Sequence, residues 1–267
     1  MRRLIITVVL AVAGGMLALA PPASATGRYT VTATVSATNV DVGQTFLVKG
    51  HVTPRATGKY ALVQLLVSGH WVTVQRARIG RYGNFRATVA VTQAGDHQYR
   101  VLKRRWHNTL RGFSPVFTVT GWRWRSVTDL PATTTPSNAS VLASGDLGST
   151  AYPATFKPLL KLGSAAGDDG SATYVLAQSC TKFDSEVGVT TDSVSSADQQ
   201  AILGVIATQG GSVTQIAGQA VAHNQDPAHV VRSGTVVSGA YALNLTGDVN
   251  AADTYVGWGN PRVYCKS

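Results

Sequence analysis

The chain has 267 residues, a formal net charge of +10 at pH 7 and two cysteines. It contains no CxxC or Cys/His zinc pattern, no G-x-S-x-G or H-E-x-x-H motif and no Gly-rich phosphate loop. These absences exclude the metal-binding and enzyme classes that those motifs mark.

The amino terminus has the pattern of a secretory signal peptide. The basic start Met1–Arg3 is followed by an apolar run, Leu4–Ala20, and by the small-residue site Ala23-Ser24-Ala25. A spanning helix needs about 20 apolar residues, and this run is shorter and interrupted by glycines, so a membrane anchor is disfavoured. We expect cleavage after Ala25, a secreted protein and no membrane span in the mature chain.

The charge is distributed unevenly along the chain. Residues 28–125 hold 15 Lys and Arg against 2 Asp and Glu, whereas residues 126–267 hold 6 against 11. Such an asymmetry predicts two domains. We place them at 26–120 and 121–267, after a signal peptide at 1–25.

The first domain shows short segments of alternating pattern with turn signals between them. Seven such segments and no helical periodicity predict an all-β sandwich; they are 29–36, 44–52, 60–67, 70–78, 83–91, 97–102 and 115–120. Tyr99, just after a Gly-Asp turn, resembles the tyrosine corner of immunoglobulin-like domains, with Val101 where antibody domains carry a cysteine. The segment order also resembles the immunoglobulin-like repeats of secreted bacterial proteins.

A dense basic cluster follows the sixth of these segments. Lys103, Arg104 and Arg105 stand together, with more arginines nearby in the sequence. Two interpretations stay open: affinity for a polyanion such as a cell-wall polymer or acidic glycan, or a solvated turn that keeps sheet edges from pairing. Binding to a specific nucleic acid is not expected.

The junction carries two tryptophans and a Pro/Thr-rich stretch. If the chain is extended there, Trp122 and Trp124 lie on one face of a strand, and we expect them to be packing anchors more than ligand contacts. Residues 131–140 are either a linker or a loop inside the second domain.

The second domain continues in β pattern. The strand candidates are 155–162, 172–177, 201–208, 230–232, 241–245 and 254–258. Residues 195–203 fit either a short helix or a loop that leads into a buried strand, and we favour the loop. Because an oxidising compartment favours pairing, we expect a disulfide between Cys180 and Cys265.

Five motifs of this half, taken in order, resemble the carbohydrate-binding modules called NPCBM. They are Tyr174-Val-Leu, Phe183-Asp-Ser-Glu-Val-Gly-Val, Ala207-Thr-Gln-Gly-Gly-Ser, Val236-Val-Ser-Gly-Ala-Tyr-Ala-Leu-Asn-Leu and Asp253-Thr-Tyr-Val-Gly-Trp-Gly-Asn-Pro-Arg-Val. The resemblance covers roughly residues 121–265. It implies a jelly-roll-like β-sandwich that binds sugars without cleaving them, and it places the disulfide at the end of the last strand. Thr190 stands where the family usually has an acidic residue.

The last strand supplies the candidate sugar contacts. Asp253, Tyr255, Trp258 and Asn260 combine aromatic faces with polar groups, as sugar sites do. Alternation places Trp258 on the face of Asn260 and Tyr255 on the other face, and we expect Trp258 in the core more than at a ligand.

Nothing in the sequence marks a catalytic or metal centre. Glu186 is the only glutamate, and no pair of carboxylates stands out for glycoside hydrolysis. His223 and His229 flank Pro227, which favours a turn over a metal site. We therefore expect no enzyme activity, no metal and no cofactor.

The favoured function is a secreted, non-catalytic protein that binds a glycan or cell-wall polymer. The alternative is a cell-wall scaffold whose basic domain binds an anionic polymer while the second domain binds a protein.

Overall fold

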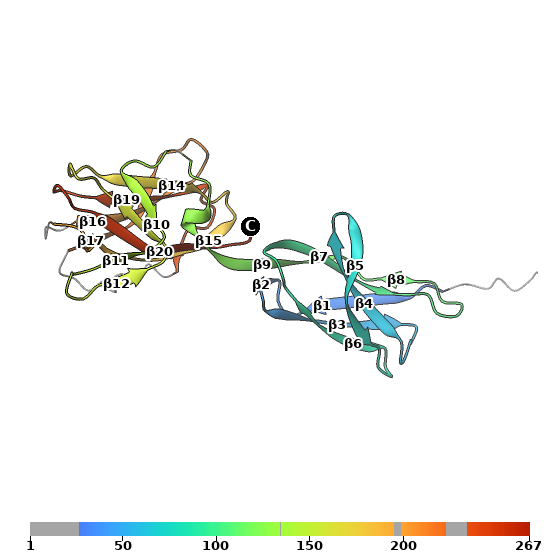
Figure 1. The fold of residues 1–267 in the computed structure, drawn as a ribbon. Helices are drawn as coiled ribbons and strands as arrows, with labels where there is room; N and C mark the ends of the chain where they lie inside the picture. Colours follow the sequence, from blue (N-terminus) through green and yellow to red (C-terminus); the bar gives the residue numbers. More distant parts are fainter. Residues whose placement is uncertain (1–26, 134, 195–198, 223–233) are drawn as a thin grey trace, which may run out of the picture.

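The computed structural model describes residues 27–267 except 134, 195–198 and 223–233. The predicted signal peptide and the His223–His229 segment lie outside the described residues. Figure 1 shows two all-β units side by side, which confirms the prediction of two β-sandwiches. Among the described residues, no helix is long and apolar enough to cross a membrane.

The first sandwich consists of two sheets. The three-stranded sheet has the order β1–β3–β6, and the strands of the second sheet follow the order β5–β4–β7–β9. Short strands β2 and β8 pair with β9 and β7. The bounds are β1 (Thr30–Val35), β2 (Asn39–Asp41), β3 (Thr45–Thr53), β4 (Tyr60–Val67), β5 (His70–Arg78), β6 (Asn84–Ala90), β7 (Gly95–Lys103), β8 (Gly112–Phe113) and β9 (Phe117–Ser126).

Alternating side chains of the two sheets form the first core. Tyr99 lies at its centre, edge-on to Phe46 and stacked on Phe117 with ring centroids 5.2 and 5.8 Å away. Val101, at the position compared with the antibody cysteine, is fully buried. Apolar packing therefore joins the two sheets of this domain, where antibody domains have a disulfide.

The second sandwich also has two main layers. One contains β10–β13–β20, with β15 pairing with β20 and β18 with β15, and the other has the order β14–β19–β16–β17. The hairpin of β11 and β12 is separate. The bounds are β10 (Ala139–Leu142), β11 (Gly145–Leu147), β12 (Ala154–Phe156), β13 (Leu159–Leu162), β14 (Gly170–Val175), β15 (Cys180–Val189), β16 (Gln199–Ile206), β17 (Thr214–Val221), β18 (Thr235–Val236), β19 (Ala242–Asp248) and β20 (Val256–Cys265).

Strand β9 belongs to both domains. Its first half pairs with β7 from Phe117 to Gly121, and its second half pairs with β20 from Arg123 to Ser126. The expected boundary at 120/121 therefore falls inside a continuous strand (Figure 1). The described residues 131–133 and 135–138 belong to the second domain, because Thr133 and Ser137 hydrogen-bond to β14, and β10 begins at Ala139.

Several side-chain contacts reinforce this junction. Tyr264 of β20 donates a hydrogen bond to the Asp41 carboxylate of the first domain. Lys266 Nζ lies 3.0 Å from Asp96 Oδ2. The disulfide between Cys180 and Cys265, present as expected, closes the end of β20 beside β9. The two domains are thus joined by main-chain pairing and by polar contacts.

Candidate functional site

Trp258, one of the four predicted sugar contacts, is a core residue. Its side chain is 0% exposed and meets Phe183 edge-on, with ring centroids 5.9 Å apart. A buried indole has no face to offer a ligand, so the expectation of core packing is the one that holds. The prediction of Trp258 as a sugar contact is therefore wrong.

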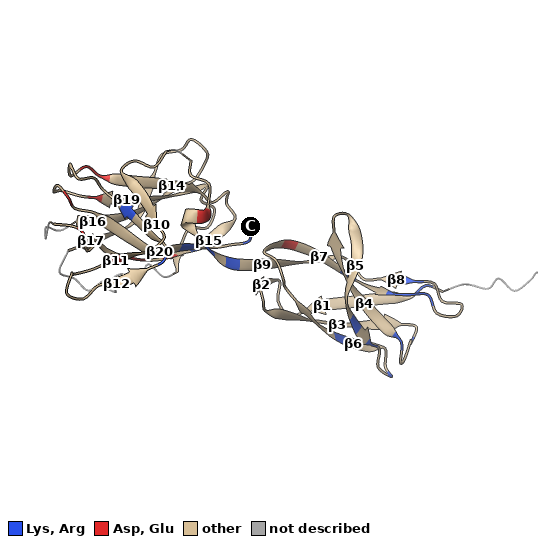
Figure 2. Cartoon of the chain, viewed as in Figure 1, with Lys and Arg blue, Asp and Glu red and all other residues tan. Residues whose placement is uncertain are grey.

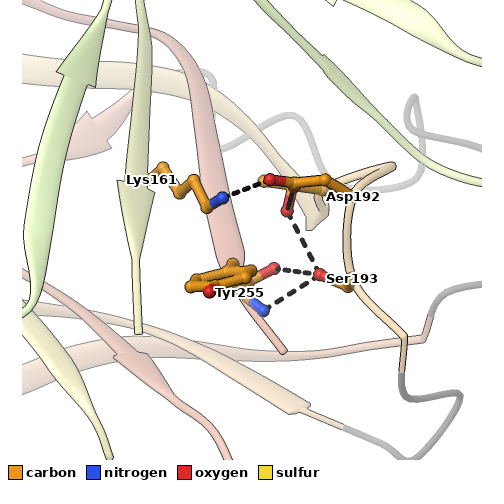
Figure 3. A network of polar contacts seen from close by, with 5 residues as sticks. Lys161, Asp192, Ser193 and Tyr255 are labelled. Carbon is orange, nitrogen blue, oxygen red and sulfur yellow. Dashed lines mark hydrogen bonds and ion pairs between the residues drawn. The ribbon is translucent and has the colours of Figure 1, made fainter. Parts of the chain in front are cut away.

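Tyr255 lies in a polar network that occupies its ring (Figure 3). The Lys161 ammonium sits 3.6 Å from the ring centroid and pairs with Asp192. Ser193 Oγ accepts a hydrogen bond of 3.0 Å from the Tyr255 backbone nitrogen. Burial acts to raise the pKa of Asp192, but the hydrogen bonds from Lys161 and Thr190 and the Lys161 charge together lower it below its usual value. Since a cation already covers this ring, a sugar cannot stack on that face.

Asp253 lies in the loop before β20. Its backbone is left-handed, with φ of 50°, and its carbonyl accepts a hydrogen bond from Val194. The side chain is exposed. Asp253 and Tyr255 therefore belong to the loop end of the domain, whereas Asn260 lies farther along the strand.

Asn260 occupies a β-bulge that the sequence did not reveal. Glu186 of β15 is opposite Gly259, whereas Asp184 is opposite Arg262, so β20 carries one extra residue between them. Asn260 has φ of 47°, a left-handed conformation that asparagine tolerates better than most residues. Its backbone nitrogen donates to Pro158 at 2.8 Å. The bulge turns the Asn260 side chain to solvent and breaks the predicted alternation with Trp258.

Glycines make room for the β11–β12 hairpin on the outer face of β20. A Cβ on Gly257 would lie 2.2 Å from Leu147 Cδ2, and one on Gly259 would lie 2.5 Å from the Phe156 ring. In the Gly257-Trp258-Gly259 stretch, the tryptophan therefore fills the core while the glycines admit the hairpin. This packing holds Phe156 beside the bulge.

The bulge, the hairpin and β15 enclose a polar cavity of about 210 Å³. Phe156, Glu186, Asn260 and Arg262 line it, together with Asp184, Ser185 and Gly259. We call this the bulge pocket. Ser185, buried below it, donates to the Gly259 carbonyl at 3.0 Å and so fixes β15 against β20.

The two carboxylates of the bulge pocket differ in their partners. Asp184 and Glu186 lie two residues apart on β15 and share its outer face, because Phe183 and Val187 are in the core. Arg262 holds Asp184 through Nε at 2.7 Å and Nη2 at 2.5 Å. Glu186 has no hydrogen bond or ion pair from its side chain within the described part of the chain. Glu186 is therefore the carboxylate available to a ligand.

Sequence reasoning missed Phe156, Glu186 and Arg262 as pocket residues. Glu186 is the only glutamate and lies within one of the five motifs, but nothing in the sequence assigns it to a site or joins it to Asn260. The usable signal was the Gly-Trp-Gly-Asn-Pro order, in which Asn-Pro after a strand favours a turn or bulge.

The two tryptophans of β9 act as junction anchors. Tyr264 stacks on Trp122 at 5.4 Å and contacts Trp124 at 5.3 Å. Trp122 Nε1 donates to Asn39 of the first domain at 3.0 Å. Because these rings contact one another across the junction, they support the anchor interpretation.

The predicted polyanion cluster requires a correction at Lys103. This residue is only 3% exposed, donates to the Arg104 carbonyl at 2.8 Å and lies 4.4 Å from the Tyr29 ring centroid. Burial, and then the charge of Lys59, lower the pKa of Lys103. Its ammonium is therefore buried inside the first domain and does not offer an exposed charge to a polyanion. Arg104 and Arg105 are exposed.

No group of three or more metal-ligating side chains is assembled among the residues that the structure describes.

The comparisons with known proteins give no family assignment. No family model and no curated protein matches the sequence. Among solved structures, the tandem CBM22 domains of Paenibacillus barcinonensis Xyn10C match at 9% identity and TM-score 0.32, over 90% of this chain and 94% of that one. A tetra-tandem repeat of a large adhesion protein matches at 13% and 0.29, over 86% and 72%. A marsupial T cell receptor matches at 8% and 0.29, over 90% and 99%. At such values these likenesses carry no argument, and the proposals below rest on the chain's own residues.

Proposed function

We propose that this chain is a secreted, non-catalytic glycan-binding protein that holds one sugar unit in the bulge pocket. The observation that supports it most is the meeting of one aromatic ring, one free carboxylate, one amide and one guanidinium in a single cavity. Sugar sites pair an apolar surface with a few polar groups that fix orientation. Phe156 supplies the first, and Glu186, Asn260 and Arg262 supply the second.

The size of the pocket sets the size of the ligand. Pockets for drug-sized molecules measure about 300–1,000 Å³, and this one measures about 210 Å³. The proposed ligand is therefore a single sugar residue, such as the end of a chain or a branch. Longer glycans would extend into solvent.

Binding without hydrolysis fits the state of the carboxylates. Hydrolysis of a glycoside by two carboxyl groups needs one of them to deliver a proton. Asp184 is held by the Arg262 guanidinium, which leaves Glu186 as a lone hydrogen-bond acceptor. The proposed role of Glu186 is to accept hydrogen bonds from sugar hydroxyls.

A glycan array followed by calorimetry tests this proposal. Glu186→Gln keeps the size of the side chain, and Asn260→Gly keeps the left-handed backbone without strain. Each variant should weaken binding of the best array ligand about tenfold or more, since a polar partner loses its hydrogen bonds. Asp253→Asn, in the loop before β20, is the matched control and should bind as the wild type does.

Two results would contradict the proposal. Unchanged affinity in both folded pocket variants would remove the bulge pocket as the site. Release of sugar from a glycoside panel, lost in Glu186→Gln, would instead make the protein a hydrolase.

A further inference from the structure

We propose that the first domain binds an acidic polysaccharide along one continuous band of cations, which wraps around the β5–β6 edge of its sandwich. The band runs from a groove over β3 and β6 to a pocket around Trp106. This inference goes beyond the sugar pocket, because it concerns the other domain, another surface and a charged ligand.

The carboxylates of the first domain are both used at its junction with the second. Asp41 accepts the Tyr264 hydroxyl, and Asp96 binds Thr120 and Lys266. The hydrogen bonds from Thr120 and Lys266, and then the charge of Lys266, lower the pKa of Asp96. In the described part of the chain, no Lys or Arg between residues 28 and 111 forms an ion pair. Figure 2 shows these cations spread over the first domain, with its visible acidic segment on β7 facing the junction.

One end of the band is a groove on the outer face of the β1–β3–β6 sheet. Lys49 and Arg86 are direct partners on neighbouring strands, and both are exposed. Like charges placed directly opposite each other destabilise a sheet, so this arrangement is unfavourable unless an anion lies between them. The groove measures about 750 Å³, and Thr32, Thr34, His51, Arg78 and Asn84 also line it.

The other end of the band is a pocket of about 310 Å³. Lys59, Arg76, Arg104 and Arg105 line it around Trp106, with Tyr60 at its margin. Lys103, whose pKa is lowered there, forms its inner wall. The pocket therefore gathers three exposed arginines and the half-buried Lys59 around the buried Lys103, and no acidic residue lines it.

Strand β5 connects the two ends. Ala77 is buried, so Arg76 and Arg78 on either side of it point outward. Arg76 lines the pocket and Arg78 lines the groove. Two residues of a strand span about 6.6–6.8 Å, a step that a polymer with regularly spaced charges can bridge. The edge strand β5 thus joins both cavities into one surface.

The lining favours an acidic polysaccharide over a nucleic acid. Arginine pairs with carboxylate and phosphate groups alike in bidentate fashion, so the arginines suit either polymer. The threonines and Asn84 of the groove can in addition bind hydroxyl groups of a sugar chain. Single-stranded nucleic acids need aromatic faces on which bases stack. The exposed Trp106 ring is already covered by Lys59 at 3.4 Å and contacted by His107. A sugar chain bearing carboxylates or sulfates matches the cations and the hydroxyl-binding side chains that line the band.

The test uses the whole secreted chain and dextran sulfate, with unsulfated dextran of equal length as the neutral probe. Binding to dextran sulfate should fall steeply as salt rises, and unsulfated dextran should not bind. Lys49→Gln/Arg86→Gln at the groove and Arg104→Gln/Arg105→Gln at the pocket should each reduce the slope of log affinity against log salt by about 2. The control Arg123→Gln/Lys182→Gln removes two cations outside the band and should leave the slope unchanged.

A comparison of long and short sulfated ligands tests whether the band is continuous. A long dextran sulfate engages both ends at once, whereas a sulfated disaccharide engages one, so wild-type protein should prefer the long chain. Either pair of substitutions should remove that preference. Thermal unfolding checks folding, and the groove pair should be at least as stable as the wild type because it relieves a like-charge contact.

Three outcomes would overturn the inference. One is equal loss of binding in the control variant and in the two band variants. Another is a length preference that survives both band variants. The third is binding of a single-stranded oligonucleotide of matched charge at equal affinity with the same sensitivity to these variants, which would replace the polysaccharide by a nucleic acid.

Discussion

At the scale of single residues, Tyr264 shows how one side chain serves both domains. Burial, and then its hydrogen bond to Asp41, raise the pKa of Tyr264 to about 12. The ring also packs between the two tryptophans of β9. Because the folded-state pKa lies above the unfolded value of about 10, the stability from this hydroxyl is complete below pH 10. It is lost as the pH rises from 10 towards 12.

Tyr264→Phe should therefore destabilise the protein by about 1 kcal/mol at pH 7, since it removes one hydrogen bond and keeps the ring contacts. The difference from the wild type should shrink at pH 11. Denaturant unfolding at the two pH values measures both effects. Tyr152→Phe, on a side chain that is 74% exposed, is the control, and a gap of the same size at both pH values would contradict the account.

Single residues also decide what the sequence could predict of the site. The core position of Trp258 was expected from the resemblance to the NPCBM modules, which have a tryptophan at this place in the last strand. The exposure of Asn260 was not expected, because alternation puts both residues on one face, and the bulge depends on how β15 pairs with β20. Lys103 was misjudged for a similar reason: a basic cluster in the sequence does not say which of its members turns inward.

At the scale of elements, the first domain was easier to predict than the second. The segments 60–67 and 70–78 match β4 and β5, which the Ser68-Gly69 turn separates clearly in the sequence. The segment 155–162 divides into β12 and β13, because the chain turns at Pro158 between them. Strand β15 was not among the predicted strands, although Lys182, Asp184 and Glu186 alternate with inward-facing residues. The buried Ser185 interrupts that apolar pattern, because it stands at a position where a half-buried strand usually has an apolar residue.

The hairpin of β11 and β12 offers a test at this scale. Gly257→Ala would place a methyl group 2.2 Å from Leu147 Cδ2, so the hairpin must shift. We expect a loss of about 1–3 kcal/mol, as for other overpacked sites, and weaker sugar binding because Phe156 moves with the hairpin. Chemical unfolding and calorimetry measure these effects.

Gly80→Ala is the matched control, because the added Cβ would meet its nearest neighbour at an ordinary 3.5 Å. If Gly257→Ala were as stable as Gly80→Ala and bound sugar normally, the hairpin would not be held by this contact.

At the scale of the whole molecule, the charge asymmetry indicated two domains, yet no linker separates them. Strand β9 pairs in both sandwiches, so the boundary falls within one strand and not in a linker. The disulfide lies at the same place, with Cys265 opposite both Cys180 and Arg123. The cation band of the first domain and the bulge pocket of the second thus lie on two domains that are joined by paired strands.

Removal of the disulfide tests this arrangement. The link spans a sequence separation of 85 residues, for which the chain-entropy argument predicts about 4–5 kcal/mol. Cys180→Ala/Cys265→Ala should therefore lower the denaturant midpoint of the second domain strongly, and reduction of the wild type should do the same. A midpoint that does not move in either case would show that strand pairing alone holds the end of β20.

The most direct test of the sugar pocket is a titration of the isotope-labelled protein with its best array ligand, followed by NMR. We expect the amide signals of Glu186, Gly259, Asn260 and Arg262 to shift first and most. Shifts centred on Asp253 and Tyr255, with the signals of the bulge unchanged, would contradict it.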